Sequence, residues 1–118
     1  IVMWGTGAPE RDFDYSGDVA RCIPYFIENY DSSEPVNLSS GSTTTIKALA
    51  EQIRDMTGFR GQINWDSSKP DGQLVKIFDV TRMKKLGLSM PTSMSAGLQK
   101  TIDWLKLHYH DRSDGIRL

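Results

Sequence analysis

The sequence predicts a small α/β domain, and three observations support this fold class. The chain has 118 residues, which is the size of one domain. Its apolar fraction is 38% and its charged fraction is 25%, values typical of a globular protein with a buried core. Short strand-like segments alternate with longer segments of helical periodicity, and this mixture indicates one α/β unit. A compact domain of this size would expose about 6,500 Å² of surface.

Four short segments have the composition or the alternation of β-strands. They are Ile1–Trp4, Pro35–Ser39, Gln62–Asp66 and, as an extended segment, Leu74–Phe78. The first of them ends at Gly5–Pro9, a loop rich in residues that interrupt regular structure.

Four segments have the apolar spacing of helices. They are Asp18–Tyr30, Thr45–Thr57, a short helix that starts at Asp79 or Thr81 and ends at Leu86-Gly87, and Met94–Tyr109. Ser16 or Gly17 is the expected cap of the first helix, and Pro24 should bend or shorten it because proline removes a backbone donor. Thr44 is the expected N-cap of the second helix and Gly58 its terminating glycine.

We expect residues 1–110 to form the folded domain and residues 111–118 to form an irregular tail, because the tail has no periodicity. The chain opens with Ile1-Val2-Met3-Trp4, inside an expected strand and without an initiator methionine. We therefore expect a piece of a longer protein, whose missing part joins at Ile1.

The charge and the cysteine content exclude several classes of protein. Fourteen lysines and arginines against fifteen acidic residues leave a net charge of -1, which argues against a general nucleic-acid-binding protein. No apolar run approaches the roughly 18 residues of a membrane-spanning helix. Cys22 is the single cysteine, which excludes an intrachain disulfide and a zinc site built from cysteines. We expect a cytoplasmic protein that binds neither nucleic acid nor membranes.

The Gly5-Thr6-Gly7 segment follows a strand, as phosphate-binding loops do. A dinucleotide-binding fingerprint, however, requires G-x-G-x-x-G leading into a helix, and here Ala8-Pro9-Glu10 follows. The chain also contains no Tyr-x-x-x-Lys pair. We therefore interpret the two glycines as turn residues and expect neither a cofactor site nor a dehydrogenase active site in this chain.

Arg11 and Trp4 are the residues most suggestive of ligand binding. Arg11 follows the glycine- and proline-rich loop, where its planar fork of donors suits a diphosphate, and Trp4 offers a flat apolar surface for a sugar or a base. The alternative is an ordinary surface arginine and a core tryptophan. His108 and His110 are two positions apart and face different directions on a helix, so we expect no metal site. Cys22 lies on an apolar stripe and is expected in the core.

A series of motifs occurs in order along almost the whole chain, to about Tyr109. The first is Trp4-Gly5-Thr6-Gly7-x-Pro9-x-Arg11-x-Phe13, followed by Asp18-x-Ala20, Pro35-x-Asn37-Leu38, Ser40-Gly41 and Thr45-Ile46-x-x-Leu49-Ala50. The rest are Phe59-x-Gly61, Asp66-x-Ser68-Lys69-Pro70-Asp71-Gly72, Lys76, Asp79-Val80-Thr81-Arg82, Leu86-Gly87 and Gly97-x-x-x-Thr101-x-x-Trp104. This ordered set resembles the GDP-L-fucose synthase family.

The resemblance implies a fold and a reaction. Members of that family are extended short-chain dehydrogenases with an N-terminal Rossmann domain and a smaller C-terminal substrate domain. This chain resembles most of the C-terminal substrate domain and lacks the Rossmann domain. The family makes GDP-L-fucose from GDP-4-keto-6-deoxymannose by epimerising C3 and C5 and then reducing C4 with NADPH.

The resemblance also implies the site residues and the partners. Trp4, Arg11 and Asp71 match positions that contact substrate in the family, and Lys76 is a fourth such position. The family's catalytic residues lie upstream, so we expect none in this chain, and Cys22 does not correspond to the catalytic cysteine. NADPH would bind to the missing domain. The implied partners are a GDP-sugar, that Rossmann domain and a second copy in a homodimer of the full-length enzyme.

Two alternatives remain open at this point. The chain could be the substrate domain of another nucleotide-sugar epimerase, reductase or dehydratase, or it could be a stand-alone binding module. A glycine-rich strand-turn-helix and a Tyr-x-x-x-Lys pair upstream of Ile1 would favour the enzymes. An initiator methionine just before Ile1 would favour the binding module.

Overall fold

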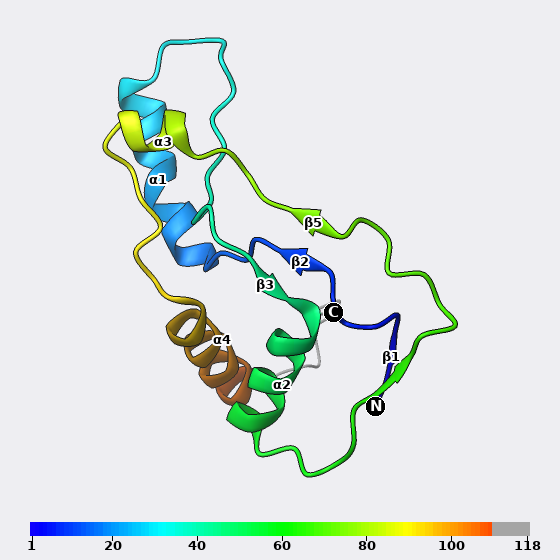
Figure 1. Cartoon of the computed structure of the whole chain (residues 1–118). Coiled ribbons are helices and arrows are strands. Elements are labelled where there is room, and N and C mark those ends of the chain that lie inside the picture. Colours follow the sequence, from blue (N-terminus) through cyan, green and yellow to red (C-terminus); the bar gives the residue numbers. More distant parts are fainter. Residues whose placement is uncertain (110–118) are drawn as a thin grey trace.

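The computed structural model of the chain describes residues 1–109 (Figure 1). The strands are β1 (Val2–Trp4), β2 (Glu10–Arg11), β3 (Thr44–Thr45), β4 (Asn64–Asp66) and β5 (Val75–Lys76). The helices are α1 (Ser16–Asn29), α2 (Ile46–Thr57), α3 (Thr81–Lys85) and α4 (Met94–His108). The predicted α/β fold with short strands and four helices is confirmed for these residues. The expected tail 111–118 lies outside them.

The strands form two small sheets that share the same two segments of chain. In one sheet β1 pairs with β4 in parallel. In the other, β2 lies between β3, which is antiparallel to it, and β5, which is parallel to it. The segments 2–11 and 64–76 therefore run side by side in the same direction and contribute one strand each to both sheets (Figure 1).

Helix α2 has the ends that the sequence predicts, with a shift of one residue at its start. The side chain of Thr45 accepts a hydrogen bond from the Ala48 N–H at 3.0 Å, so Thr45 is the N-cap and the prediction of Thr44 is wrong. Thr44 is instead the sheet partner of Arg11. Gly58 ends the helix in the left-handed conformation (φ 68°), as expected of a terminating glycine.

Helix α1 differs from its prediction at the start and in the middle. Ser16 is already its first helical residue, and Tyr15 takes the N-cap position without a side-chain cap bond, so both predicted caps are wrong. Pro24 lies inside the helix, which nevertheless continues to Asn29. The turns on either side therefore hold the helix together across the one donor that proline lacks.

The segment Pro35–Ser39, predicted as a strand, is irregular, and that prediction is wrong. Hydrogen bonds from side chains hold this segment in place of the backbone hydrogen bonds of a strand. The Asn37 side chain donates to the Asp79 carbonyl at 3.1 Å, and the hydroxyl of the fully buried Ser39 donates to the Asp12 carboxylate. Pro35 has no N–H, and the Val36–Leu38 alternation is too short to impose a strand without a neighbouring edge.

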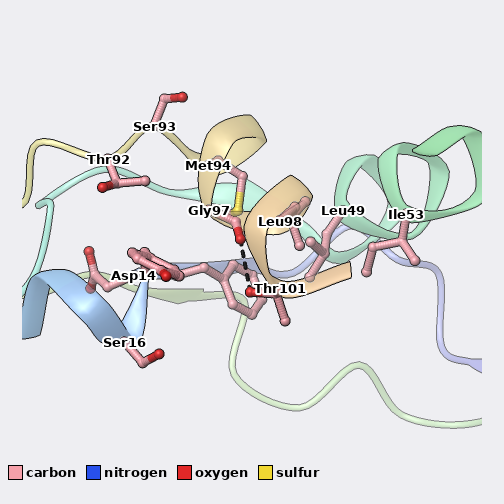
Figure 2. A pocket seen from close by; sticks show the side chains of 12 residues that line it. Asp14, Ser16, Leu49, Ile53, Thr92, Ser93, Met94, Gly97, Leu98 and Thr101 are labelled. Carbon is pink, nitrogen blue, oxygen red and sulfur yellow. Dashed lines mark hydrogen bonds between the residues drawn. The ribbon is translucent and has the colours of Figure 1, made fainter. Parts of the chain in front are cut away.

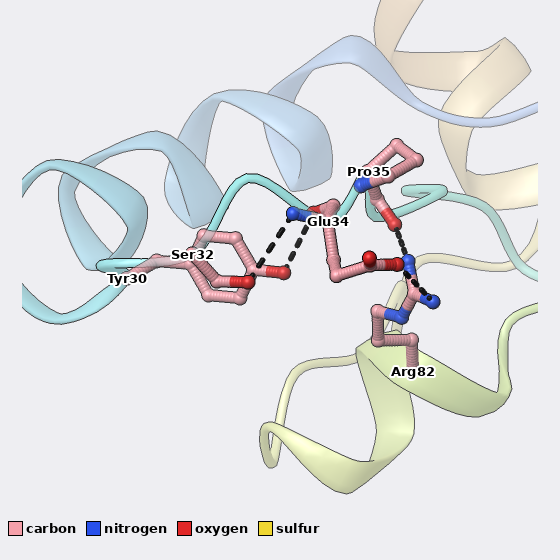
Figure 3. Close-up of polar contacts among 5 residues, drawn as sticks. All are labelled: Tyr30, Ser32, Glu34, Pro35 and Arg82. Carbon is pink, nitrogen blue, oxygen red and sulfur yellow. Dashed lines mark hydrogen bonds and ion pairs between the residues drawn. The ribbon is translucent and has the colours of Figure 1, made fainter.

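The loop between α1 and β3 is also held to α3 by a charged side chain (Figure 3). Arg82 donates to the carboxylate of Glu34 at 2.9 Å and to the carbonyl of Pro35. The Tyr30 hydroxyl donates to the Glu34 carbonyl at 2.7 Å, and the Glu34 N–H donates to the Ser32 hydroxyl at 3.2 Å. These polar contacts close the loop onto the helix that follows β5.

Asp18 connects α1 to the segment before α4 from inside the domain. Its carboxylate is 1% exposed and accepts hydrogen bonds from the N–H and the hydroxyl of Thr92, each at 2.7 Å. Burial by itself raises the pKa of Asp18, but the two bonds from Thr92 and the charges of Arg21 and Lys100 outweigh it and hold the pKa below its usual value. The ionised carboxylate therefore fixes α1 relative to α4.

The buried apolar core of the described residues is small. Its members are Cys22, Val80, Met83 and Ile102. The accessible surface of the whole chain is 8564 Å². Large apolar side chains on β1, β5 and α4 are exposed, among them Trp4 at 74% and Leu107 at 76%. No helix within residues 1–109 is long and apolar enough to cross a membrane.

Candidate functional site

Two cationic residues lie side by side on adjacent strands. Arg11 of β2 is the register partner of Lys76 of β5, and Glu10 is the partner of Val75. Side chains of register partners project from the same face of a sheet, so the guanidinium and the ammonium group share one face. The structure thus brings together two of the predicted site residues that lie far apart in the sequence.

The acidic side chains beside Arg11 in the sequence do not neutralise this pair. Glu10 accepts a hydrogen bond from Thr43, and Asp12 accepts hydrogen bonds from Ser39 and Ser40. Within residues 1–109, neither Arg11 nor Lys76 forms an ion pair.

The contacts that the two cations do make leave their charges without an acidic partner in the described part of the chain. Arg11 Nη1 donates to the carbonyl of Glu10 at 2.7 Å, and Lys76 Nζ lies 5.4 Å from the ring centroid of Phe78. Like charges on neighbouring strands repel each other. An anion between them would relieve that repulsion, and a diphosphate carries suitable charge and acceptor oxygens.

Trp4 is an exposed side chain and does not belong to the core. It ends β1, and 74% of its surface is accessible. The ammonium group of Lys69 lies 5.8 Å from the centroid of its ring. The alternative of a core tryptophan is therefore wrong, and the flat ring is available for stacking against a base or a sugar.

Asp71 holds the loop that follows β1. Its carboxylate accepts a hydrogen bond from the Thr6 N–H at 2.6 Å and another from the Thr6 hydroxyl at 2.7 Å. These two hydrogen bonds lower the pKa of Asp71, so the carboxylate is ionised at neutral pH. The Thr6 hydroxyl in turn accepts from the Ala8 N–H at 3.2 Å. Thr6 was not singled out from the sequence, and its place between two glycines is the only signal that could have identified it.

The first amides of α2 hold the same loop from the other side. The Ile46 N–H donates to the Pro9 carbonyl and the Lys47 N–H donates to the Gly7 carbonyl, both at 2.9 Å. Gly5 and Gly7 have φ values of 82° and 76°, which confirms their interpretation as turn residues. These helix amides are thus occupied by the protein's own backbone.

The four predicted residues lie along the two parallel segments 2–11 and 64–76. Trp4 and Asp71 lie at the connections between the sheets, where Thr6 bridges the two loops. Arg11 and Lys76 lie on the strands that follow these loops. All four therefore belong to the pair of segments that run side by side.

A separate cavity lies between the start of α1 and the helices α2 and α4 (Figure 2). Its volume is about 240 Å³, and Leu49, Ile53, Met94 and Leu98 give it a mainly apolar lining. None of the four predicted site residues lines this cavity. It lies where α2 and α4 face each other.

The remaining residues of interest have structural surroundings. Cys22 is 4% exposed, which confirms its place in the core. His108 stacks on Trp104 with ring centroids 4.5 Å apart, and its Nδ1 lies 2.7 Å from the Trp104 carbonyl oxygen. Within residues 1–109, no three His, Cys, Asp or Glu side chains are grouped so as to hold a metal ion. His110 lies outside the described residues.

Known proteins resemble this chain in both sequence and structure, although no model of a protein family matches it. The protein "Probable GDP-L-fucose synthase 1" of Oryza sativa subsp. japonica is 39% identical over 104 residues, which are 88% of this chain and 32% of that protein. A GDP-L-fucose synthetase from Naegleria fowleri, solved with NADP, has 31% identity and a TM-score of 0.85. A UDP-glucose 4-epimerase from Thermotoga maritima, solved with UDP-glucose, has 25% identity and a TM-score of 0.82.

These comparisons confirm the resemblance to GDP-L-fucose synthases. The chain spans about a third of the length of the relatives that it matches. The Naegleria and Thermotoga structures each cover 92% of this chain, which covers 35% of theirs. The matching region is the C-terminal part of extended short-chain dehydrogenase structures, as predicted.

Proposed function

We propose that this chain is the GDP-sugar-binding part of an NADPH-dependent GDP-4-keto-6-deoxymannose epimerase and reductase that makes GDP-L-fucose. The observation that carries the proposal is the register pairing of Arg11 with Lys76, two cations without an acidic partner among the described residues. The 39% identity to a probable GDP-L-fucose synthase supports the choice of substrate. In this proposal the complete protein is a cytoplasmic homodimer.

The cation pair would hold the diphosphate of the substrate. The planar guanidinium of Arg11 can donate two parallel hydrogen bonds to one phosphate, whereas the ammonium of Lys76 acts as a point charge on the other. Because both side chains start from paired strands, their backbone positions are fixed before the ligand arrives. Trp4 would stack on the base or the sugar, and Lys69 would leave the ring or turn towards the phosphates. Asp71 would border the same site.

The residues of this chain do not fit a dinucleotide cofactor. The Gly5-Thr6-Gly7 loop leads into β2 instead of a helix, and the first amides of α2 already donate to Gly7 and Pro9. We therefore assign NADPH, together with the catalytic residues, to a Rossmann domain outside this chain. The contribution of this chain would be to bind and orient the substrate.

A different nucleotide-sugar enzyme is the alternative, because the diphosphate is common to all such substrates. The likeness to a structure solved with UDP-glucose keeps a UDP-sugar in consideration. The two cations give no preference between bases, so the choice between GDP and UDP falls to Trp4 and the loops beside it. A comparison of GDP with UDP as ligands separates the two functions.

The test is a nuclear magnetic resonance titration of the ¹⁵N-labelled chain with GDP, GMP and UDP. We expect GDP to shift the amides of β2 and β5 and to bind more tightly than GMP, which lacks the second phosphate. Hydrogen bonds to charged groups contribute about 1.5–3 kcal/mol each, so Arg11→Ala should weaken GDP binding roughly ten- to a hundredfold. Arg11→Lys should recover part of this loss, because it keeps the charge without the fork.

Arg60→Ala is the matched control, since Arg60 is an exposed arginine on the loop after α2. It should leave the GDP affinity unchanged. An unchanged affinity in Arg11→Ala would refute the assignment of the diphosphate. Tighter binding of UDP than of GDP would transfer the proposal to a UDP-sugar enzyme.

A further inference from the structure

The two parallel segments change their register between the first sheet and the second. In the β1–β4 pair, Val2 faces Asn64 and Trp4 faces Asp66, so partners are 62 positions apart. In the β2–β5 pair, Arg11 faces Lys76, and partners are 65 positions apart. Three extra residues are therefore accommodated in the loop between β4 and β5.

The hydrogen bonds between Thr6 and Asp71 already have the new register. These two residues are separated by 65 positions, the same spacing as Arg11 and Lys76. The extra residues lie before Asp71, in a turn in which the Lys69 N–H donates to the Asp66 carbonyl at 3.1 Å. The Thr6–Asp71 contact is thus the first cross-link after the turn, and it precedes β5 along the chain.

The β2–β5 pair has little else to fix its register. Each strand is two residues long, and the flanking bonds are Glu10 N–H to the Leu74 carbonyl (2.7 Å) and Asp12 N–H to the Lys76 carbonyl (3.2 Å). Register is strongly specified where one face of a strand is buried and weakly specified otherwise. Here both faces of segment 74–78 are exposed, with Leu74 at 65% and Phe78 at 38% on the face of Lys76 and Val75 at 50% and Ile77 at 54% on the other, so burial does not choose between registers.

A slip by one residue would abolish the cation pair. It would place Val75 or Ile77 opposite Arg11 and would turn Lys76 to the other face of the sheet. Both carboxylate oxygens of Asp71 accept from Thr6, an arrangement suited to holding two segments together. We propose that Asp71 is a positioning residue, whose bonds to Thr6 set the register that places Lys76 beside Arg11. The proposal deepens the proposed function, since it assumes that the cation pair binds the diphosphate.

The first experiment reads the register without any ligand. In the unaltered chain, nuclear Overhauser effects between backbone protons of residues 10–12 and 74–76 should show Arg11 opposite Lys76. In Asp71→Ala these effects should disappear or move to a different register, whereas those between residues 2–4 and 64–66 should persist. Asp55→Ala, which removes an exposed carboxylate on α2, should change neither set. Persistence of the Arg11–Lys76 register in Asp71→Ala would overturn the proposal.

A milder variant covers the case in which Asp71→Ala fails to fold. Thr6→Val removes the hydroxyl bond to Asp71 but keeps the backbone N–H bond, and Thr6→Ser keeps both. We expect Thr6→Val to weaken the cross-strand effects between β2 and β5, and Thr6→Ser to retain them. If the nuclear Overhauser effects between β2 and β5 are equally strong in Thr6→Val and Thr6→Ser, the proposal is also overturned.

The second experiment connects the register to binding through a double-mutant cycle on GDP affinity. Lys76→Met should weaken GDP binding at least tenfold in the unaltered chain but about twofold or less in the Asp71→Ala background, because Lys76 has already left the site there. Trp4→Ala should weaken GDP binding equally in both backgrounds. Additive effects of Asp71→Ala and Lys76→Met would overturn the positioning role and would favour a direct contact of Asp71 with the ligand.

The two experiments separate the inference from the proposed function. If GDP does not bind, or if Lys76→Met leaves the affinity for GDP unchanged, the diphosphate site at Arg11 and Lys76 is refuted. The claim that the strand register affects GDP binding is then refuted as well. The control of register by Asp71 is still decided by the cross-strand effects alone.

Discussion

The substitution Gly7→Ala tests whether the loop between β1 and β2 is held rigidly against its neighbours. An added Cβ would lie 2.7 and 2.8 Å from two atoms of the Trp65 ring and 2.9 Å from the Cβ of Lys47. Trp65 is the central residue of β4 and pairs with Met3, so its ring cannot move away freely. Gly7 also has a φ of 76°, a conformation that disfavours any residue with a side chain.

The cost of Gly7→Ala has two parts. The left-handed conformation costs a residue with a Cβ about 1–2 kcal/mol, and overpacking of a filled site typically costs about 1–3 kcal/mol, which gives about 2–5 kcal/mol in total. Gly58→Ala is the matched control. Its φ is 68°, but an added Cβ meets nothing within 4 Å, so only the conformational cost of about 1–2 kcal/mol applies.

Urea denaturation followed by circular dichroism measures both variants, and the difference between their free energies of unfolding isolates the contact with Trp65 and Lys47. Gly7→Ala should lower the free energy of unfolding by about 1–3 kcal/mol more than Gly58→Ala. Equal losses in the two variants would show that the loop can move away from β4. The reasoning about a rigid connection between the two sheets would then fail.

Three further predictions concern a cap, a buried acid and the cofactor. Thr45→Ala should lower the free energy of unfolding by about 0.5–2 kcal/mol, measured by urea denaturation, because it removes the acceptor for the Ala48 N–H. The pKa of Asp18 is lowered in the folded chain, so the ionised carboxylate stabilises the fold at pH values above its ordinary pKa of 3.8. This stability is lost as the pH falls through the folded pKa. Asp18→Asn should therefore flatten the dependence of the urea denaturation midpoint on pH between about 5 and 3. The isolated chain should oxidise no NADPH in the presence of GDP-4-keto-6-deoxymannose, and turnover above background would contradict the assignment of the cofactor to another domain.

The helices and the longer strands could be predicted because their signals are local. Helix α2 has apolar side chains at helical spacing and a terminating glycine, and these features determine its bounds within one residue. The strands β1 and β4 have apolar residues next to turn-forming ones. The two-residue strands β2 and β3 have no such pattern, since Glu10–Arg11 and Thr44–Thr45 are polar. Their pairing depends on tertiary contacts. The same dependence explains the wrong prediction for Pro35–Ser39, which has the local alternation of a strand but no neighbouring strand edge and is irregular.

For the candidate site, too, local sequence features could be predicted, whereas features that depend on tertiary contacts could not. A turn-rich loop next to an arginine indicates a binding residue at Arg11, but nothing local connects it to Lys76. Only the resemblance to a family associated the two residues, and it gave no reason for their proximity. That reason lies in the turn before Asp71, which adds three residues to one of two parallel segments and thereby changes which side chain faces Arg11. Because both strands are short and β5 is exposed, burial does not choose this register, and we expect mutations at Thr6 and Asp71 to alter ligand binding without touching the ligand.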